Sequence, residues 1–564
     1  MITFPTDRLA TARPRLVPWL LVAAAALPVA WMALRVGATL RNVAYWDEID
    51  SALFLLLQLA DHPTWQQVLS YLFEITNEHR TVTSRLIFAG SYWLTGTIDF
   101  AVLGWIGNAF LCGAGALLVR AAGSTERRMR MLVLLAGLLF QLQHHENFQW
   151  SGGSIDHFQI VLLAGACVVG LTRGTQTGFL AASLFALLAT FTLAHGIVLW
   201  PLGALMLGLE KRGGRLAGWL ALAAAALAFF LFGFGANPGH NITLTAAAIG
   251  RMVRYWLEIL GAPLALGVKP AEPFLGVALL ALFGRQLARR QWAREKTALA
   301  LAAWAIGAVA LIAIGRAELT HGLVYSRYFV LSGLAWALVL FMQFEAWADP
   351  ARPHLITLRA LPLLAVFNVA ANIQAAHDAH TWAICRDNAA HFFVHYGRDG
   401  VGRFSLYPDP ARATHVIRAA EQAGLYRMPQ LCEPRRFPAA RPAAAFAYCV
   451  DRIDVAEQLV VIDGWVARAG QVARTGQIHV VLQSAKSRLI FTTVPVPRLD
   501  VAKVHTTERW LDSGFRFQLR RWLLPAEDFQ VGLLLEADGQ AEFVLTAHRL
   551  DMTGKGEGHL ANEQ

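Results

Sequence analysis

Charged residues are scarce in this chain of 564 residues. Asp, Glu, Lys and Arg make up only 16% of it, whereas 56% of the residues are hydrophobic and the mean hydropathy is +0.43. A soluble protein of this size would carry more charge, so the composition excludes an ordinary soluble chain and predicts helices that face lipid. The length also exceeds that of one compact domain and predicts a second domain beside a membrane bundle.

Glycine-rich loops of the P-loop or dinucleotide-binding type are absent, as are internal repeats of fixed period. Direct use of ATP or of a nucleotide sugar is therefore not expected. The formal charge of +10 lies largely in short loops between apolar runs. In that position it indicates membrane topology rather than a nucleic-acid partner.

Cysteine is also rare, with five residues in the whole chain. Cys112 and Cys167 lie inside apolar runs, where they are expected to pack as small hydrophobic residues. Cys385, Cys432 and Cys449 follow the last apolar run. Three thiols leave one over if two of them pair, and a bridge between Cys432 and Cys449 is one of the open alternatives.

The apolar runs predict about eleven transmembrane helices, beginning with a retained helix at about 17–34. The others lie near 99–120, 131–143, 157–172, 178–194, 196–209, 216–234, 273–284, 297–314, 329–343 and 355–372. Basic residues before the first helix place the N-terminus in the cytoplasm, and the loops expected on that side are basic as well. An odd number of spans leaves the chain after about residue 372 on the outer side of a bacterial inner membrane.

Polar clusters gather in the loops predicted on the outer side. Ionisable groups at membrane depth are costly and mark substrate paths, so this one-sided placement predicts a shared site. Single members also have plainer explanations: Asp50 as a solvated loop charge, or Arg316 and Arg327 as side chains that reach the headgroups. The clusters comprise Asp47, Glu48, Asp50, Glu78, His79, Arg80 and Arg85 in loop 39–98, then His144, His145, Glu146, Asp156 and His157, then His195, and later Arg316, Glu318, His321, Tyr325, Arg327 and Tyr328.

The step Trp46-Asp47-Glu48 in the first outer loop, followed by residues 77–80 before Arg85, resembles the polytopic GT-C glycosyltransferases. These integral-membrane enzymes use lipid-linked sugar donors. Segments 146–150, 195–201 and 315–328 are similar to features of bacterial members, and the resemblance covers about residues 15 to 372.

The resemblance implies an inverting transfer in which a carboxylate of the first outer loop takes the proton of the acceptor hydroxyl and a polyprenyl phosphate leaves. It assigns that role to Asp47, with Glu48 as a neighbour that raises the proton affinity of the pair or takes over the role. Cations would bind the leaving phosphate, and the candidates are Arg80, Arg85, Arg316 and Arg327. The supporting polar residues are Glu78, His79, His145, Glu146 and Asp156. A divalent cation stays open, although the abundant arginines favour a site without an essential metal.

The remaining chain divides into a connector at 373–442 and a region at 443–564 with period-two alternation, which predicts six short strands in a small β-sandwich. Trp465 and Trp510 are candidates for stacking on sugars, but a core position is the more common role of such a Trp, and it is favoured for Trp465. Residues 1–372 form the predicted GT-C-like transmembrane domain.

The sequence therefore predicts an α-helical polytopic membrane enzyme that transfers a sugar from a polyprenyl-phosphate donor to a cell-surface glycan such as lipopolysaccharide or an exopolysaccharide. The alternatives are a lipid-linked sugar flippase or transporter, a membrane acyltransferase or polysaccharide polymerase, and a catalytically silent scaffold. Polar residues at one face argue against transport, and Asp47-Glu48 directly after the first helix favours glycosyl transfer. A scaffold would stay fully functional without Asp47.

Overall fold

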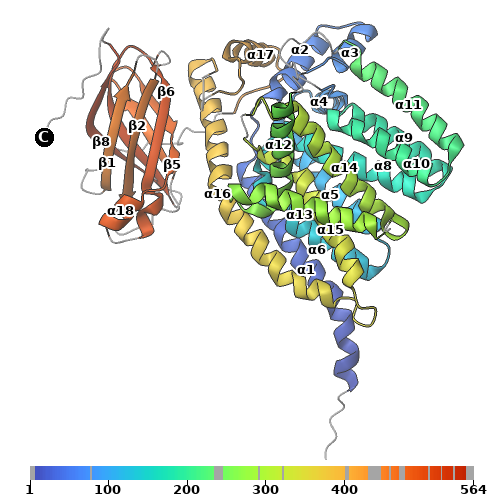
Figure 1. The fold of residues 1–564 in the computed structure, drawn as a ribbon. Helices are drawn as coiled ribbons and strands as arrows, with labels where there is room; N and C mark the ends of the chain where they lie inside the picture. Colours follow the sequence, from blue (N-terminus) through green and yellow to red (C-terminus); the bar gives the residue numbers. More distant parts are fainter. Residues whose placement is uncertain are drawn as a thin grey trace, which may run out of the picture. The chain divides into compact units, whose positions relative to one another are not determined.

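The computed structural model describes residues 7–76, 79–233, 245–289, 292–320, 323–399, 405–429, 446–456, 459–468, 477–505, 508–521, 524–537 and 540–553. The chain forms two compact units (Figure 1). The first comprises Met1–Arg41 and Asp50–Ala379, and the second comprises Asn42–Ile49 and His380–Gln564. The short segment Asn42–Ile49, which precedes most of the bundle in sequence, thus folds with the C-terminal unit.

The first unit is a bundle of helices. α16 (Leu355–Tyr396) begins in it and runs on into the second unit, which also contains α17 (Pro410–Gln422). The other helices are α1 (Asp7–Thr39), the π-helix η1 (Ile49–Phe54), α2 (Leu55–Ala60), α3 (Trp65–Leu72), α4 (Val82–Thr95), α5 (Phe100–Ala121), α6 (Thr125–Leu139), η2 (Leu142–His144), α7 (His145–Gln149), α8 (Ser151–Arg173), α9 (Gln176–Thr190), η3 (Ala194–Val198), α10 (Leu199–Leu209), α11 (Gly213–Leu231), α12 (Ala246–Ala265), η5 (Lys269–Ala271), α13 (Glu272–Ala288), α14 (Trp292–Arg316), η6 (Ser326–Tyr328) and α15 (Phe329–Trp347).

Eight helices in the described ranges are long and apolar enough to cross a membrane, which confirms a polytopic, mainly helical membrane protein. They lie at Val17–Thr39, Phe100–Ala121, Ser151–Arg173, Gly213–Leu231, Lys269–Ala288, Arg294–Arg316, Ser326–Trp347 and Leu355–Asp387. The other three predicted spans fall on α6, α9 and α10, which have 15, 15 and 11 residues. At about 1.5 Å per residue, even 15 residues cover only about 22 Å of a hydrocarbon core of about 30 Å. Eleven spans, and the sides that follow from that number, stay a prediction.

Two glycines let α12 and α13 pack at very short range. A Cβ on Gly261 would lie 1.8 Å from the carbonyl oxygen of Glu272, and a Cβ on Gly276 would lie 2.2 Å from that of Leu257. Small residues at facing positions allow helix backbones to approach closely, which is a common way of packing helices in membranes. Neither glycine can be replaced here without separating the two helices.

The described C-terminal part contains two four-stranded sheets, both fully antiparallel, with strand orders β1-β2-β6-β5 and β4-β3-β7-β8. Alternate residues of both sheets, such as Ile462 and Val480, belong to one hydrophobic cluster, as the period-two pattern predicted. The strands are β1 (Phe446–Val455), β2 (Leu459–Arg468), β3 (Gln477–Gln483), β4 (Arg488–Thr492), β5 (Val494–Val496), β6 (Gly514–Arg520), β7 (Asp528–Ala537) and β8 (Gln540–Asp551), with α18 (Leu499–Val504) and η10 (Glu508–Ser513) between β5 and β6.

Candidate functional site

Arg85 organises the loop that follows α1. It lies on α4 and is only 2% exposed, and its guanidinium reaches the end of α3. It donates hydrogen bonds to the carbonyl oxygens of Tyr71 (2.7 Å), Leu72 (3.2 Å) and Glu74 (2.8 Å) and to Oγ1 of Thr76 (2.8 Å). The last carbonyls of a helix lack partners within the helix, so Arg85 caps α3 and holds it against α4.

Three carboxylates lie in the electrostatic range of this buried cation. Glu74 approaches Nη2 of Arg85 at 3.9 Å, and Asp50 of η1 and Asp156 of α8 also act on the guanidinium. Burial lowers the pKa of Arg85, whereas the three carboxylates raise it. Residues from η1, α4 and α8, which are distant in sequence, therefore share one polar region.

Arg80 joins the same loop to the end of α11. Its Nε donates to the carbonyl oxygen of Phe230 at 3.1 Å, and its two Nη atoms donate to those of Phe73 and Phe232. The guanidinium also lies 5.6 Å from the centre of the Phe229 ring, a cation–π contact. Burial lowers the pKa of Arg80. Arg80 and Arg85, two of the four arginines predicted to bind phosphate, are thus engaged with backbone carbonyls. α2, α3 and α4 lie together near one end of α11 (Figure 1).

Histidines from three segments meet in the bundle. Nδ1 of His79 accepts the backbone N–H of Ala194 at 3.1 Å, and the rings of His157 and His195 stack with centres 6.4 Å apart. Nδ1 of His157 and Nε2 of His195 are buried and have no hydrogen-bond partner among the described residues. Buried polar atoms normally have such a partner, so these two nitrogens have hydrogen-bonding capacity left for a water molecule or a ligand group.

The predicted cations Arg316 and Arg327 belong to this region too, since both act electrostatically on His157, as do His79 and His195. Arg316 ends α14. The guanidinium of Arg327 lies 4.7 Å and 5.5 Å from the ring centres of Tyr325 and Tyr328. These two cation–π contacts help to keep the guanidinium in place.

Glu146 fixes the backbone of η6. Its Oε2 accepts the backbone N–H of Arg327 at 3.0 Å, and its own N–H donates to Oγ of Ser326 at 3.2 Å. The side chain of Asn147 donates to the carbonyl oxygen of Arg327 at 2.9 Å. These reciprocal bonds make Glu146 a residue that positions Arg327.

The predicted residue His145 lies one position before Glu146. Its Nδ1 lies 3.2 Å from the carbonyl oxygen of Leu142. Burial lowers the pKa of His145, and the charges of Glu146 and Asp378 raise it. We therefore expect His145 to be neutral at physiological pH and to bind Leu142 from its packed position.

Asp156 lies between α8 and α4. Ser84 donates to its Oδ1, and one turn further Oγ1 of Thr83 donates to Oε1 of Gln159 at 3.0 Å. Thr83 also shares a hydrogen bond of 2.7 Å with Thr192. Asp156 is half-buried, and its position between two helices brings its charge into the region around Arg85.

Glu48 and Asp47 belong to the second unit. Glu48 is 1% exposed, and its Oε2 accepts the backbone N–H of Tyr45 at 2.8 Å, whereas Asp47 is half-buried. The intervening Trp46 has a φ of 51°, a strained conformation for a bulky residue, and such strain concentrates at functional sites.

Residues of the connector hold this segment in place. The hydroxyl of Tyr426 accepts the N–H of Ala44 at 3.1 Å and donates to the carbonyl oxygen of Asn42 at 2.9 Å. The N–H of Trp46 donates to the carbonyl oxygen of Leu406 at 2.8 Å. Tyr426 was not predicted as a site residue, because no local pattern links it to a loop 382 residues earlier.

Some predicted residues lie outside the described part of the chain, namely Glu78, His321 and Cys432. Cys449 is an exposed free thiol. The described residues include no group of three His, Cys, Asp or Glu side chains placed to hold a metal ion.

Trp465 lies on β2, between β1 and β6, but it is half-buried and does not belong to the core cluster, so the core position favoured for it is wrong. Its ring centre lies 5.9 Å from that of Trp510, and the exposed His505 lies 5.6 Å and 4.4 Å from the two. The three rings form one aromatic group that is open to solvent in part.

No family model, curated protein or solved structure matches the chain.

Proposed function

We propose that this chain is a GT-C-like membrane glycosyltransferase that moves a sugar from a polyprenyl-phosphate donor to a cell-surface glycan. The observation that supports it best is the convergence, within the first unit, of carboxylates and cations from separate loops. Asp50 and Asp156 act on Arg85, while Arg316 and Arg327 act on His157. Paired acids and cations are what proton abstraction from a hydroxyl and departure of a phosphate require.

In this proposal Asp47 is the general base. Its carboxylate takes the proton of the acceptor hydroxyl, the hydroxyl oxygen attacks the anomeric carbon, and the bond from that carbon to the phosphate oxygen breaks with inversion. The polyprenyl phosphate leaves with the electron pair. Glu48 supports the loop, because it is buried and one of its oxygens binds Tyr45. Asp47 precedes Asp50 by three residues, so the chain alone keeps their Cα atoms within about 11 Å.

The leaving phosphate is assigned to Arg316 and Arg327. Arg80 and Arg85 donate most of their hydrogen bonds to backbone carbonyls. In this proposal they hold the loops of the site in place and add to its positive electrostatic potential, without binding the phosphate directly. The open nitrogens of His157 and His195 would hold sugar hydroxyls. The wider proposal keeps the eleven-span topology, with the site at the outer face, and a β-sandwich arrangement of the two C-terminal sheets.

The test measures transfer by mass spectrometry. Purified full-length wild type and Asp47→Asn are incubated with a panel of polyprenyl-phosphate sugars and envelope glycan acceptors. We expect transfer by the wild type and a fall of at least about a hundredfold in the variant, the usual scale of a lost general base. Asp349→Asn, at an exposed position between α15 and α16, is the matched control and should retain full activity.

Equal transfer by wild type and Asp47→Asn would remove Asp47 from the mechanism. If the wild type transfers no sugar from any donor while a known enzyme of this class does so in the same panel, glycosyl transfer itself would be wrong.

A further inference from the structure

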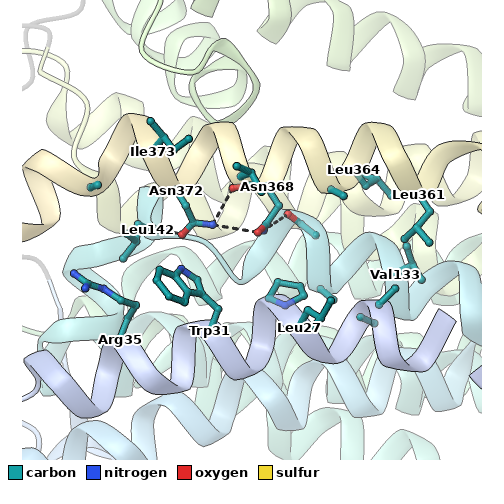
Figure 2. Close-up of a pocket in the computed structure, with 18 residues that line it drawn as sticks. Leu27, Trp31, Arg35, Val133, Leu142, Leu361, Leu364, Asn368, Asn372 and Ile373 are labelled. Atoms are coloured by element: carbon teal, nitrogen blue, oxygen red, sulfur yellow. Dashed lines mark hydrogen bonds between the residues drawn. The ribbon is translucent and has the colours of Figure 1, made fainter. Parts of the chain in front are cut away.

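A groove of about 650 Å³ lies between α1, α6 and α16, and its lining includes none of the residues assigned to catalysis. Figure 2 shows Leu27, Trp31 and Arg35 of α1 on one side and Leu361 to Ile373 of α16 on the other, with Val133 of α6 between them. Nearly all of its lining is apolar. The volume falls within the range of about 300–1,000 Å³ that is typical of ligand sites.

The groove is built into the fold. At one end α1, α6 and α16 pack together through residues that include Leu21, Val133 and Leu361. Further along, the side chain of Asn368 donates to the carbonyl oxygens of Gly137 (3.0 Å) and Phe140 (3.1 Å) and so holds α16 against α6. These contacts fix the walls on either side of an open channel.

The open side of the groove presents apolar side chains. Leu27 and Ile373 are each 71% exposed. In a membrane protein such residues face acyl chains, so the natural occupant is the tail of a lipid.

Arg35 gives the groove a charged end. Its Nε is buried and has no hydrogen-bond partner within the described ranges, and Arg35 forms no ion pair with another described residue. Its guanidinium lies 6.0 Å from the ring centre of Trp31, and Trp marks the headgroup level of membranes. A cation without a carboxylate at the mouth of an apolar groove favours an anionic headgroup.

The length of the groove matches one leaflet. From Ala24 to Arg35 the lining of α1 spans twelve residues, or about 16 Å for the steps between them at about 1.5 Å per residue. Half of a hydrocarbon core of about 30 Å is about 15 Å. A chain that begins at Arg35 would therefore end near the bilayer centre, as the acyl chain of a phospholipid does.

We propose that this groove binds an acyl chain of one anionic phospholipid, with its phosphate at Arg35. The site is separate from the proposed glycosyl-transfer site and does not depend on that function. The bound lipid would fill the space between α1 and α16.

Native mass spectrometry of the full-length protein tests the proposal. The protein is exchanged from detergent into phosphatidylglycerol or phosphatidylcholine with identical acyl chains, and the retained lipid is counted. We expect the wild type to retain one phosphatidylglycerol with an affinity about five- to tenfold above that for phosphatidylcholine, the scale of one charge contact at a membrane surface. Arg35→Gln should lose this preference, and Arg120→Gln, at an exposed position in the last turn of α5, should keep it.

A second variant does not depend on Arg35. Ala365 lines the groove from an exposed position on α16, so Ala365→Trp would fill it without disturbing buried packing and should abolish retention. Equal retention of both lipids by the wild type, an unchanged preference in Arg35→Gln, or unchanged retention in Ala365→Trp would each overturn the proposal. Displacement of phosphatidylglycerol by an equal amount of undecaprenyl phosphate would overturn the choice of a phospholipid.

Discussion

Replacing Arg85 separates its structural role from the phosphate-binding role that the sequence indicated. Arg85→Met removes the donor for three carbonyl oxygens and one hydroxyl at the end of α3. Each lost hydrogen bond contributes about 1 kcal/mol, and groups left buried without a partner cost about 1–3 kcal/mol. Water can reach part of this loop, because Tyr71 and Glu74 are not buried, so we expect a loss of about 3–4 kcal/mol in the local stability of residues 71–76.

Hydrogen exchange measured by mass spectrometry reports that local stability directly. A loss of about 3 kcal/mol raises the fraction of open loop more than a hundredfold, so amides of residues 65–76 should exchange much faster in Arg85→Met. Arg85→Lys should recover only part of the protection, because a lysine presents a single point charge instead of a planar fork of five donors. Arg120→Met is the control and should leave these residues unchanged.

The opposite outcome would refute this reasoning. If Arg85→Met left the exchange of residues 65–76 unchanged while sugar transfer fell, Arg85 would act on the substrate and not on the loop. Recovery of transfer by Arg85→Lys would support a role on the substrate, because the positive charge of a lysine ammonium group can still bind a phosphate without the several N–H donors of a guanidinium.

Three further predictions concern the second unit. The Tyr426 hydroxyl bridges two backbone groups of residues 42–49, so Tyr426→Phe should speed the hydrogen exchange of these residues and lower sugar transfer about tenfold. The helical circular dichroism should stay unchanged. Unchanged hydrogen exchange would contradict this prediction. Nε2 of His479 lies 3.4 Å from Oε2 of Glu536, and this contact lowers the pKa of Glu536 below its ordinary 4.5. The stabilisation from the contact is therefore present above about pH 4.5 and lost as the pH falls through the folded pKa. Differential scanning calorimetry should therefore find Glu536→Gln less stable than wild type near pH 7, with a difference that vanishes near pH 3; a constant difference would refute the link. Trp510→Ala removes one of two neighbouring aromatic faces, so it should weaken the binding of an acceptor glycan up to about tenfold in titration calorimetry. An unchanged affinity would show that the aromatic group of Trp465 and Trp510 does not bind the acceptor.

Long apolar runs predicted most helices of the bundle, because length and hydropathy are both readable in the sequence. α12 (Ala246–Ala265) was missed. Its apolar residues alternate with exposed Arg251 and Arg254, so it is amphipathic and shows no continuous run. Among the strands, β1 and β5 were missed: the short β5 follows β4 after a single residue, Thr493, whose N–H and hydroxyl both bind Ile478.

The candidate site was predictable as a set of polar residues but not as a set of contacts. Arg85, Asp156 and Arg327 could be selected as candidates from the polar clusters between apolar runs. Their hydrogen-bond partners could not be predicted. Arg80 and Arg85 bind backbone carbonyl groups, and because every residue has such a group, the sequence does not show which ones are bound. For this reason two arginines predicted as phosphate ligands turn out to hold loop segments together.

The division between the two units has a consequence for the proposed mechanism. It falls between Ile49 and Asp50, inside the single helical segment η1. Asp50 acts on Arg85 of the bundle, whereas the residues just before it are bonded to Tyr426 and Leu406 of the connector. A change in the connector would therefore act on the segment that carries Asp47, whereas Asp156 belongs to α8 of the first unit. If Asp47 is the base, connector mutations should lower the rate of transfer and leave donor binding intact, a separation that a site built within the bundle alone would not produce.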